Sequence, residues 1–152
     1  MRSSKKHFAA KYALYYRAID KADKLISEIQ KFSKDNAKDA DEVIKRYTTQ
    51  WANIDKHYRG FYTAFDHIES NDSLHELRSL VENIYTNSYL MKLSILWADK
   101  LEMISSFRQL SGQKQYDFYN LIVAPASKKE CTVVIISDGF RYECGMELHN
   151  RF

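Results

Sequence analysis

Apolar side chains recur at steps of three and four residues along most of the first hundred positions, and this spacing constrains the fold more than any other feature. Such steps keep side chains on one face of an α-helix. One stripe starts at Phe8, a second runs from Val43 to Ile68, and a third runs from Leu74 to Ile104. The first consists of Phe8, Tyr12, Tyr15, Ile19, Ala22, Ile26 and Ile29. We therefore predict long helices whose apolar faces pack together.

Polar segments separate these stripes and predict where the helices end. The segment from Ser33 to Asp39 predicts a turn and offers an Asp or Asn N-cap for the second helix. Asp72 or Ser73 is a candidate N-cap for the third, with Glu76 at capping-box spacing from Ser73. Gly60 indicates a kink or close packing within the second helix.

Two breaks lie further along the chain. The third stripe is weakest at Asn87 and Ser88, which leaves open whether it forms one helix or two. A short amphipathic piece, 115–123, is expected to end at or just before Pro125. Residues 1–124 are thus predicted to form a helical region of three or four helices.

The pattern changes after residue 124. Residues 131–136 are a continuous, mostly β-branched run, which is typical of a strand buried on both faces of a parallel sheet. Ser137, Asp138 and Gly139 follow as a tight turn, and a helix is expected next, with Phe140, Cys144 and Leu148 on one face. A lone strand cannot form a sheet. We therefore expect residues 125–152 to be the start of an α/β domain. Either the chain is the front part of a larger protein, or its strand pairs with another chain.

Composition excludes several classes of protein. The net charge of +3 does not favour direct nucleic-acid binding, and no segment has the roughly 18 uninterrupted apolar residues that span a bilayer. Cys131 and Cys144 show neither a disulfide framework nor zinc-knuckle spacing. Lys11 and Arg17 interrupt what would be the apolar core of a signal peptide. A soluble, cytoplasmic protein is expected.

Asp138 is the residue with the clearest chemical potential. In open α/β sheets, ligands bind beyond the carboxyl ends of the strands, where the next helix directs its free N–H groups. A carboxylate there can hold a divalent cation, and Arg141 is a candidate contact for an anionic phosphate. On position alone, an Asp between a strand and a helix is more often an N-cap than a metal ligand, and Arg141 and Glu143 are interpreted as solvated charges of the first helical turn.

The segment from Val133 to Glu143 resembles the opening strand and turn of the PglZ domain, an apolar strand followed by Ser-Asp-Ala-Leu-Arg-Tyr-Glu. Gly139 and Phe140 replace the alanine and leucine of that pattern. Upstream, residues 77–90, Trp97, Phe118 and Tyr119 are similar to the helical region that precedes this domain.

The resemblance implies an alkaline-phosphatase-like fold and a metal-dependent phosphatase or phosphohydrolase of a bacterial anti-phage (BREX) defence system. It implies that Asp138 is one ligand of a divalent metal site, usually zinc. The nucleophile and the remaining ligands of that superfamily come later in the chain than Phe152, so the present residues are expected to be inactive alone. Phosphorylated or nucleotide substrates and other defence-system subunits as partners are also implied. The competing hypothesis is a helical protein-interaction module or scaffold of a defence complex.

Other candidate residues are weaker. Ser137 lacks a histidine at a recognisable offset and a Gly-x-Ser-x-Gly context, so we interpret it as structural. His75 and Glu76 begin a zinc-protease motif, but Ser79 stands where its second histidine belongs. His57 and His67 lack partners that would define a site, so we expect both to be packing or surface residues.

Overall fold

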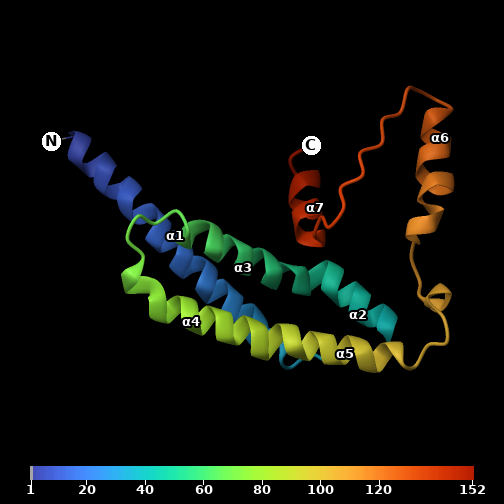
Figure 1. Cartoon of the computed structure of the whole chain (residues 1–152), viewed down its shortest axis with the longest axis horizontal. Helices are drawn as coiled ribbons and strands as arrows, with labels where there is room; N and C mark the ends of the chain where they lie inside the picture. Colours follow the sequence, from blue (N-terminus) through green and yellow to red (C-terminus); the bar gives the residue numbers. More distant parts are fainter. Residues whose placement is uncertain (1) are drawn as a thin grey trace.

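Three long helical segments lie side by side in the computed structural model, which describes residues 2–152 and the side chains from Tyr12 onward (Figure 1). The first is α1 (Arg2–Phe32). The second comprises α2 (Ala40–Arg46), the π-helical turn η1 (Tyr47–Trp51) and α3 (Ala52–Phe65). The third comprises a 3₁₀ turn, η2 (Asp72–Leu74), then α4 (His75–Asn83), the π-helical η3 (Ile84–Leu90) and α5 (Met91–Leu101). The helical region predicted from the apolar stripes is therefore confirmed.

The third segment is one uninterrupted helical run, which settles the alternative that the sequence left open. Asn87 and Ser88, its weakest point, lie within the π-helical η3. The irregularity predicted there is accommodated by a wider turn instead of a break.

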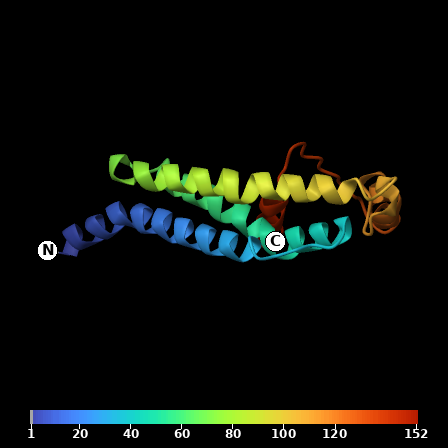
Figure 2. The same cartoon turned by 90° about the horizontal axis from the view of Figure 1, so that it is seen from below.

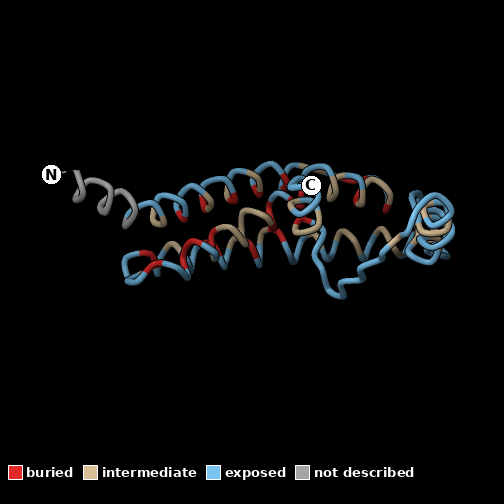
Figure 3. The backbone as a smooth tube through the Cα atoms, turned by 90° about the horizontal axis from the view of Figure 1, so that it is seen from above, coloured by how far each residue is buried: buried red, intermediate tan, exposed pale blue. Residues whose placement is uncertain are grey.

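The core lies along the axis between the three segments (Figure 3). Most predicted positions of the second stripe are buried, including Trp51, Ile54 and Phe61. The prediction for α1 was partly wrong: Ile19 is 49% exposed, and the buried face consists of Ala18, Ala22, Leu25, Ile29 and Phe32. The side chain of Phe8 lies outside the described residues.

Close packing explains the shift of the buried face on α1. A Cβ atom added to Gly60 of α3 would lie 3.2 Å from the aliphatic carbons of Lys21 on α1. The small side chains of Ala18 and Ala22 are fully buried. Helices approach closely where side chains are small, so α1 turns its alanines inward. Gly60 therefore marks close packing, one of the two outcomes that its position predicted.

One predicted helix cap is confirmed and the other is wrong. The side chain of Asp39 accepts a 2.8 Å hydrogen bond from the backbone N–H of Glu42, and the carboxylate of Glu42 accepts one of 2.8 Å from the N–H of Lys38. Neither Asp72 nor Ser73 caps α4, because a 3₁₀ turn containing both precedes that helix without a side-chain cap.

The chain beyond α5 leaves the bundle. It forms two 3₁₀ turns, η4 (Phe107–Gln109) and η5 (Gln115–Asp117), and then the π-helical η6 (Tyr119–Val123), which continues into α6 (Ala124–Ser127). The loop is fastened to α2 by a 2.7 Å hydrogen bond from the N–H of Ser111 to Asp41. Pro125 was expected to end this piece but lies in the first turn of α6, where the N–H that proline lacks is least needed.

No strand forms among residues 2–152. Residues 131–137 instead lie in the largely exposed connection between α6 and α7 (Tyr142–His149), and α7 lies beside α3 (Figure 1). Val133, Ile135 and Ile136 are 81%, 88% and 88% exposed. A strand of this kind needs neighbours on both sides, and the described residues supply none. The strand prediction for residues 131–136 therefore stays a prediction.

None of the helices in the described part of the chain combines the length and the apolar character that crossing a bilayer would require.

Candidate functional site

Asp138 lies in the exposed turn between residues 131–137 and α7. Gly139 beside it has φ +68°, a left-handed conformation that glycine adopts without strain. The helix begins only at Tyr142, with Arg141 at its N-cap position and no side-chain cap. Asp138 is therefore not an N-cap, and its carboxylate is left available to solvent.

The described residues do not by themselves complete a metal site. No group of three or more His, Cys, Asp or Glu side chains suited to a metal ion occurs in the part of the chain that the structure describes. Zinc in proteins usually has three or four protein ligands. Asp138 could supply one of them, so the donors present here do not fit a complete zinc centre.

Arg141 stands at the edge of a cleft of about 470 Å³ between α3, η3 and the start of α7. Asp55, Glu82 and Glu143 also line this cleft, together with several tyrosines. The surroundings of Arg141 are thus more acidic than its sequence position indicated.

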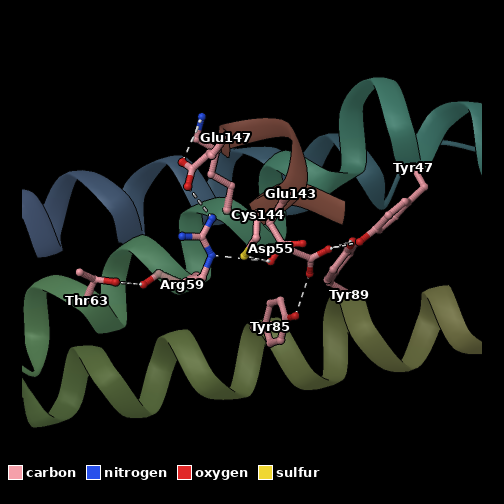
Figure 4. Close-up of polar contacts among 10 residues, drawn as sticks. Tyr47, Asp55, Arg59, Thr63, Tyr85, Tyr89, Glu143, Cys144 and Glu147 are labelled. Atoms are coloured by element: carbon pink, nitrogen blue, oxygen red, sulfur yellow. Dashed lines mark hydrogen bonds and ion pairs between the residues drawn. The ribbon is translucent and has the colours of Figure 1, made fainter. Parts of the chain in front are cut away.

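Helix α7 is attached to α3 by ion pairs (Figure 4). Arg59 donates a 2.8 Å hydrogen bond to Glu147, and the ammonium of Lys56 lies 3.5 Å from the same carboxylate. The Nε of Arg59 lies 3.7 Å from a carboxylate oxygen of Glu143. Glu143 is only 3% exposed, so its interpretation as a solvated charge was wrong: α7 turns it toward α3.

Asp55 is the buried centre of a second group of polar contacts. It accepts hydrogen bonds from Tyr47 at 2.9 Å, Tyr85 at 2.8 Å and Tyr89 at 3.3 Å. The Tyr89 hydroxyl also lies 3.3 Å from the carbonyl oxygen of Trp51. The tyrosines come from η1 and η3, so the carboxylate of Asp55 joins the second helical segment to the third (Figure 4).

The electrostatics of this group follow from its burial. Removal from water raises the pKa of Asp55, although the hydrogen bonds from Tyr85 and Tyr47 act in the opposite direction. Burial, followed by the charge of Asp55, raises the pKa of Tyr47, Tyr85 and Tyr89, so their hydroxyls remain donors. These three donors hold the carboxylate of Asp55 in place between the second and third helical segments.

A neighbouring group is more exposed. Tyr58 and Tyr62 of α3 both donate to Glu82, at 2.8 and 2.5 Å, and these bonds lower the pKa of Glu82. The Tyr58 ring stacks on Tyr85 with centroids 3.7 Å apart. The stacked rings therefore connect the Glu82 group to the buried Asp55 group, and members of both groups line the cleft.

Sequence reasoning did not single out Asp55 or Arg59, and it did not foresee the contact of Glu143 with α3. Asp55 lies next to the apolar stripe and was indistinguishable from a surface acid. The available signal was the set of tyrosines on the second and third stripes, because a buried tyrosine hydroxyl usually finds a hydrogen-bond partner. Arg59 had no local signal, since Glu147 is 88 positions away.

Three histidines of the described part, and both cysteines, behave as packing or surface residues. His57 is half-buried with an unpartnered Nδ1, and burial lowers its pKa. His67 Nδ1 lies 2.7 Å from the carbonyl oxygen of Thr63 and His75 contacts the ring of Phe65. Cys131 and Cys144 are both free thiols.

Comparison with known proteins gives two informative relatives. The chain is 45% identical over 112 residues to the alkaline phosphatase-like protein PglZ of Bacillus cereus (strain H3081.97), a match covering 72% of the chain and 13% of the relative. It is 30% identical over 152 residues to the alkaline phosphatase-like protein BrxZ of Escherichia coli O9:H4 (strain HS), covering 92% of the chain and 17% of the relative. No protein-family model matches the sequence, and no solved structure matches it either.

The chain thus corresponds to less than one fifth of either relative's length. The similarity extends over most of this chain and agrees with the pattern around Asp138. On this evidence the chain belongs to the PglZ family of alkaline phosphatase-like proteins.

Proposed function

We propose that this chain is the helical region and the first strand and helix of the alkaline-phosphatase-like domain in a PglZ-type protein of a bacterial anti-phage (BREX) system. In this proposal the complete protein is a metal-dependent phosphohydrolase. The support is the similarity to PglZ and BrxZ, both named as alkaline phosphatase-like proteins. We further propose a cytoplasmic location and other subunits of the defence system as partners.

The observation that carries the proposal is the exposed apolar run that ends at Asp138. Ile135 and Ile136 are 88% exposed, which is costly for large β-branched side chains unless another element covers them. Neighbouring strands on both sides would cover them and would place Asp138 at the carboxyl edge of a sheet. That edge is where ligands bind in open α/β folds.

In this proposal Asp138 supplies one metal ligand and the other ligands come from segments outside the present residues. A bound zinc ion would supply Lewis-acid chemistry for a phosphoryl or phosphodiester group. Arg141, three positions later, would bind a phosphate oxygen after leaving the acidic cleft. Because a single carboxylate does not make a metal centre, the 152-residue chain alone is expected to be inactive.

The test uses the complete gene product that carries this segment. Asp138→Asn keeps the size of the side chain but removes its charge, and the expected result is loss of bound zinc and of metal-dependent hydrolysis of an aryl phosphate, with the helical content unchanged. Asp99→Asn is the matched control, since Asp99 is an exposed aspartate on α5. Zinc content and hydrolysis at wild-type levels in Asp138→Asn would contradict the proposal.

An interaction module is the second candidate, and one observation favours it. Leu90, Met91 and Ile95 on η3 and α5 are 43%, 52% and 55% exposed, and an apolar cavity of about 220 Å³ lies nearby between Ile44, Tyr47, Leu93 and Trp97. Apolar side chains gathered in this way can bind a partner. If Ile95→Glu abolished association with the purified subunits of the same defence system while Asp138→Asn changed no activity, the scaffold function would be favoured over the enzyme.

A further inference from the structure

The contact between α3 and α7 is built from charges. Lys56 and Arg59 lie three positions apart on α3, and Glu143 and Glu147 lie four positions apart on α7, so each pair occupies one helix face. Arg59 reaches both carboxylates, at 2.8 Å for Glu147 and 3.7 Å for Glu143. The Tyr142 hydroxyl adds a 3.2 Å hydrogen bond to the carbonyl oxygen of Thr48.

Apolar packing contributes little to this contact. Met146 and Leu148 of α7 remain 40% and 46% exposed. A cavity of about 200 Å³ remains beside the contact, with Asn53 on one side and Met146 and Asn150 on the other. Tightly packed interfaces leave few gaps of this size. The attachment of α7 therefore depends on its ion pairs more than on buried apolar surface.

Arg59 is the essential member of these pairs. Glu143 is 3% exposed and Asp55, a second buried carboxylate, is close enough for each to repel the other. A buried carboxylate without a cation is strongly disfavoured. The Nε of Arg59 is itself buried without a hydrogen bond and points toward Glu143, so Arg59 is the cation beside Glu143 at this contact (Figure 4).

The same contact restrains the turn that carries Asp138. Only three residues, 139–141, separate Asp138 from α7. The Phe140 ring folds back against Gly145, 3.8 Å from where a Cβ atom would stand. Movement of α7 away from α3 would therefore move this turn as well.

We infer that Arg59 is a positioning residue, which holds α7 on α3 and thereby fixes the Asp138 turn relative to the helical region. The attachment of α7 to α3 involves only residues of this chain. Its effect on Asp138 as a metal ligand rests on the proposed function. The attachment and its effect on metal binding can be tested separately.

Cys144 reports on the attachment because its thiol is half-buried on α7, with Sγ 3.7 Å from a Glu143 oxygen. The probe is the rate of maleimide labelling of Cys144 in a Cys131→Ser background, which removes the exposed second thiol. Arg59→Gln is expected to speed the labelling about tenfold, because it leaves Glu143 without its cation. Arg59→Lys, which keeps the charge but not the forked geometry, should give an intermediate rate.

Arg78→Gln is the matched control, since Arg78 lies over the rings of Tyr62 and Phe65 and away from α7. Its labelling rate should equal that of the Cys131→Ser parent. Raising the salt concentration should speed labelling in the parent more than in Arg59→Gln, because screening weakens ion pairs. A labelling rate for Arg59→Gln within twofold of the parent, with helical content unchanged, would overturn the inference. If Arg59→Gln lost helical content, Glu147→Gln would replace it, with the same expected and contradicting results.

The effect of Arg59 on Asp138 as a metal ligand is measured as the zinc affinity of the complete protein. Arg59→Gln should weaken zinc binding while Asp138→Asn abolishes it. Faster Cys144 labelling with unchanged zinc affinity in Arg59→Gln would overturn the positioning role alone. Unchanged zinc binding in Asp138→Asn would instead overturn the proposed function and leave the attachment of α7 intact.

Discussion

The hydroxyl of Tyr85 donates a 2.8 Å hydrogen bond to Asp55, thirty positions earlier in the chain. Both residues are buried, and the bond joins η3 to α3 (Figure 4). Figure 2 shows the long helical segments of the bundle from below. Tyr89 and Tyr47 complete the set of donors. The side of the bundle that faces α7 is therefore organised around one carboxylate.

Tyr85→Phe should destabilise the chain by about 1–3 kcal/mol, because it removes one donor from a buried carboxylate and adds no new contact. Denaturant unfolding followed by circular dichroism measures the change. Tyr16→Phe is the control, since Tyr16 is 73% exposed, and it should stay within about 0.5 kcal/mol of wild type. Equal stabilities of the two variants would contradict the role given to Asp55.

Asp55 and Glu82 should respond to pH in opposite directions. Burial raises the pKa of Asp55 above its ordinary value of 3.8. The resulting contribution of Asp55 to the free energy of unfolding is therefore fully present below pH 3.8, and it is lost as the pH rises through the pKa of the folded state. Hydrogen bonds from Tyr62 and Tyr58 lower the pKa of Glu82 below its ordinary value of 4.5. The resulting contribution of Glu82 to the free energy of unfolding is therefore present above pH 4.5, and it is lost as the pH falls through the pKa of the folded state.

The measurement is unfolding free energy from pH 3 to pH 8 for wild type, Asp55→Asn and Glu82→Gln, a range that spans roughly one unit or more on either side of ordinary carboxyl values. As the pH falls, the free energy of unfolding of the wild type should rise relative to that of Asp55→Asn. Over the same change of pH, it should fall relative to that of Glu82→Gln. The same sign in both comparisons would show that these environments have been misassigned.

Gly60→Ala should stabilise the chain by about 0.5–1 kcal/mol, because alanine favours the helix interior over glycine. The new methyl group would lie 3.2 Å from flexible side-chain carbons of Lys21, which can move aside. Gly60→Val, with a larger branched side chain, should instead destabilise it. Thermal unfolding distinguishes the two, and a loss of stability in Gly60→Ala would mean that α1 and α3 cannot separate even slightly.

Helix positions could be predicted from the sequence because steps of three and four residues reflect the geometry of a single helix. The buried stripe of α2 and α3 was found in this way. The buried face of α1 was not, since it depends on Ala18, Ala22 and the close approach at Gly60, which are properties of a pair of helices.

The candidate site shows the same division. Asp138 could be singled out because its motif is local. The attachment of α7 could not, because Arg59 and Glu147 lie 88 positions apart and each looks like an ordinary surface charge in the sequence. Similarly, the interpretation of Asp138 as an N-cap was wrong because Gly139 turns the chain and delays the helix until Tyr142.

Ile135→Asp tests the predicted strand. Ile135 is 88% exposed, so in the 152-residue chain this substitution should change stability by no more than about 0.5 kcal/mol. In the complete protein, if residues 131–136 form a buried strand, the substitution should lower the free energy of unfolding by at least about 2 kcal/mol or prevent folding, because it places a charge in an apolar layer. Equal tolerance in both contexts would rule out a strand buried on both faces.

The central claim is that the carboxylate of Asp138 binds a metal ion in the complete protein. Anomalous diffraction from crystals of that protein grown with zinc tests it most directly. The account predicts an anomalous peak at about 2.0–2.2 Å from an Asp138 oxygen, the usual zinc–carboxylate distance. A fully occupied zinc site elsewhere, with Asp138 bonded only to backbone amides or water, would contradict it.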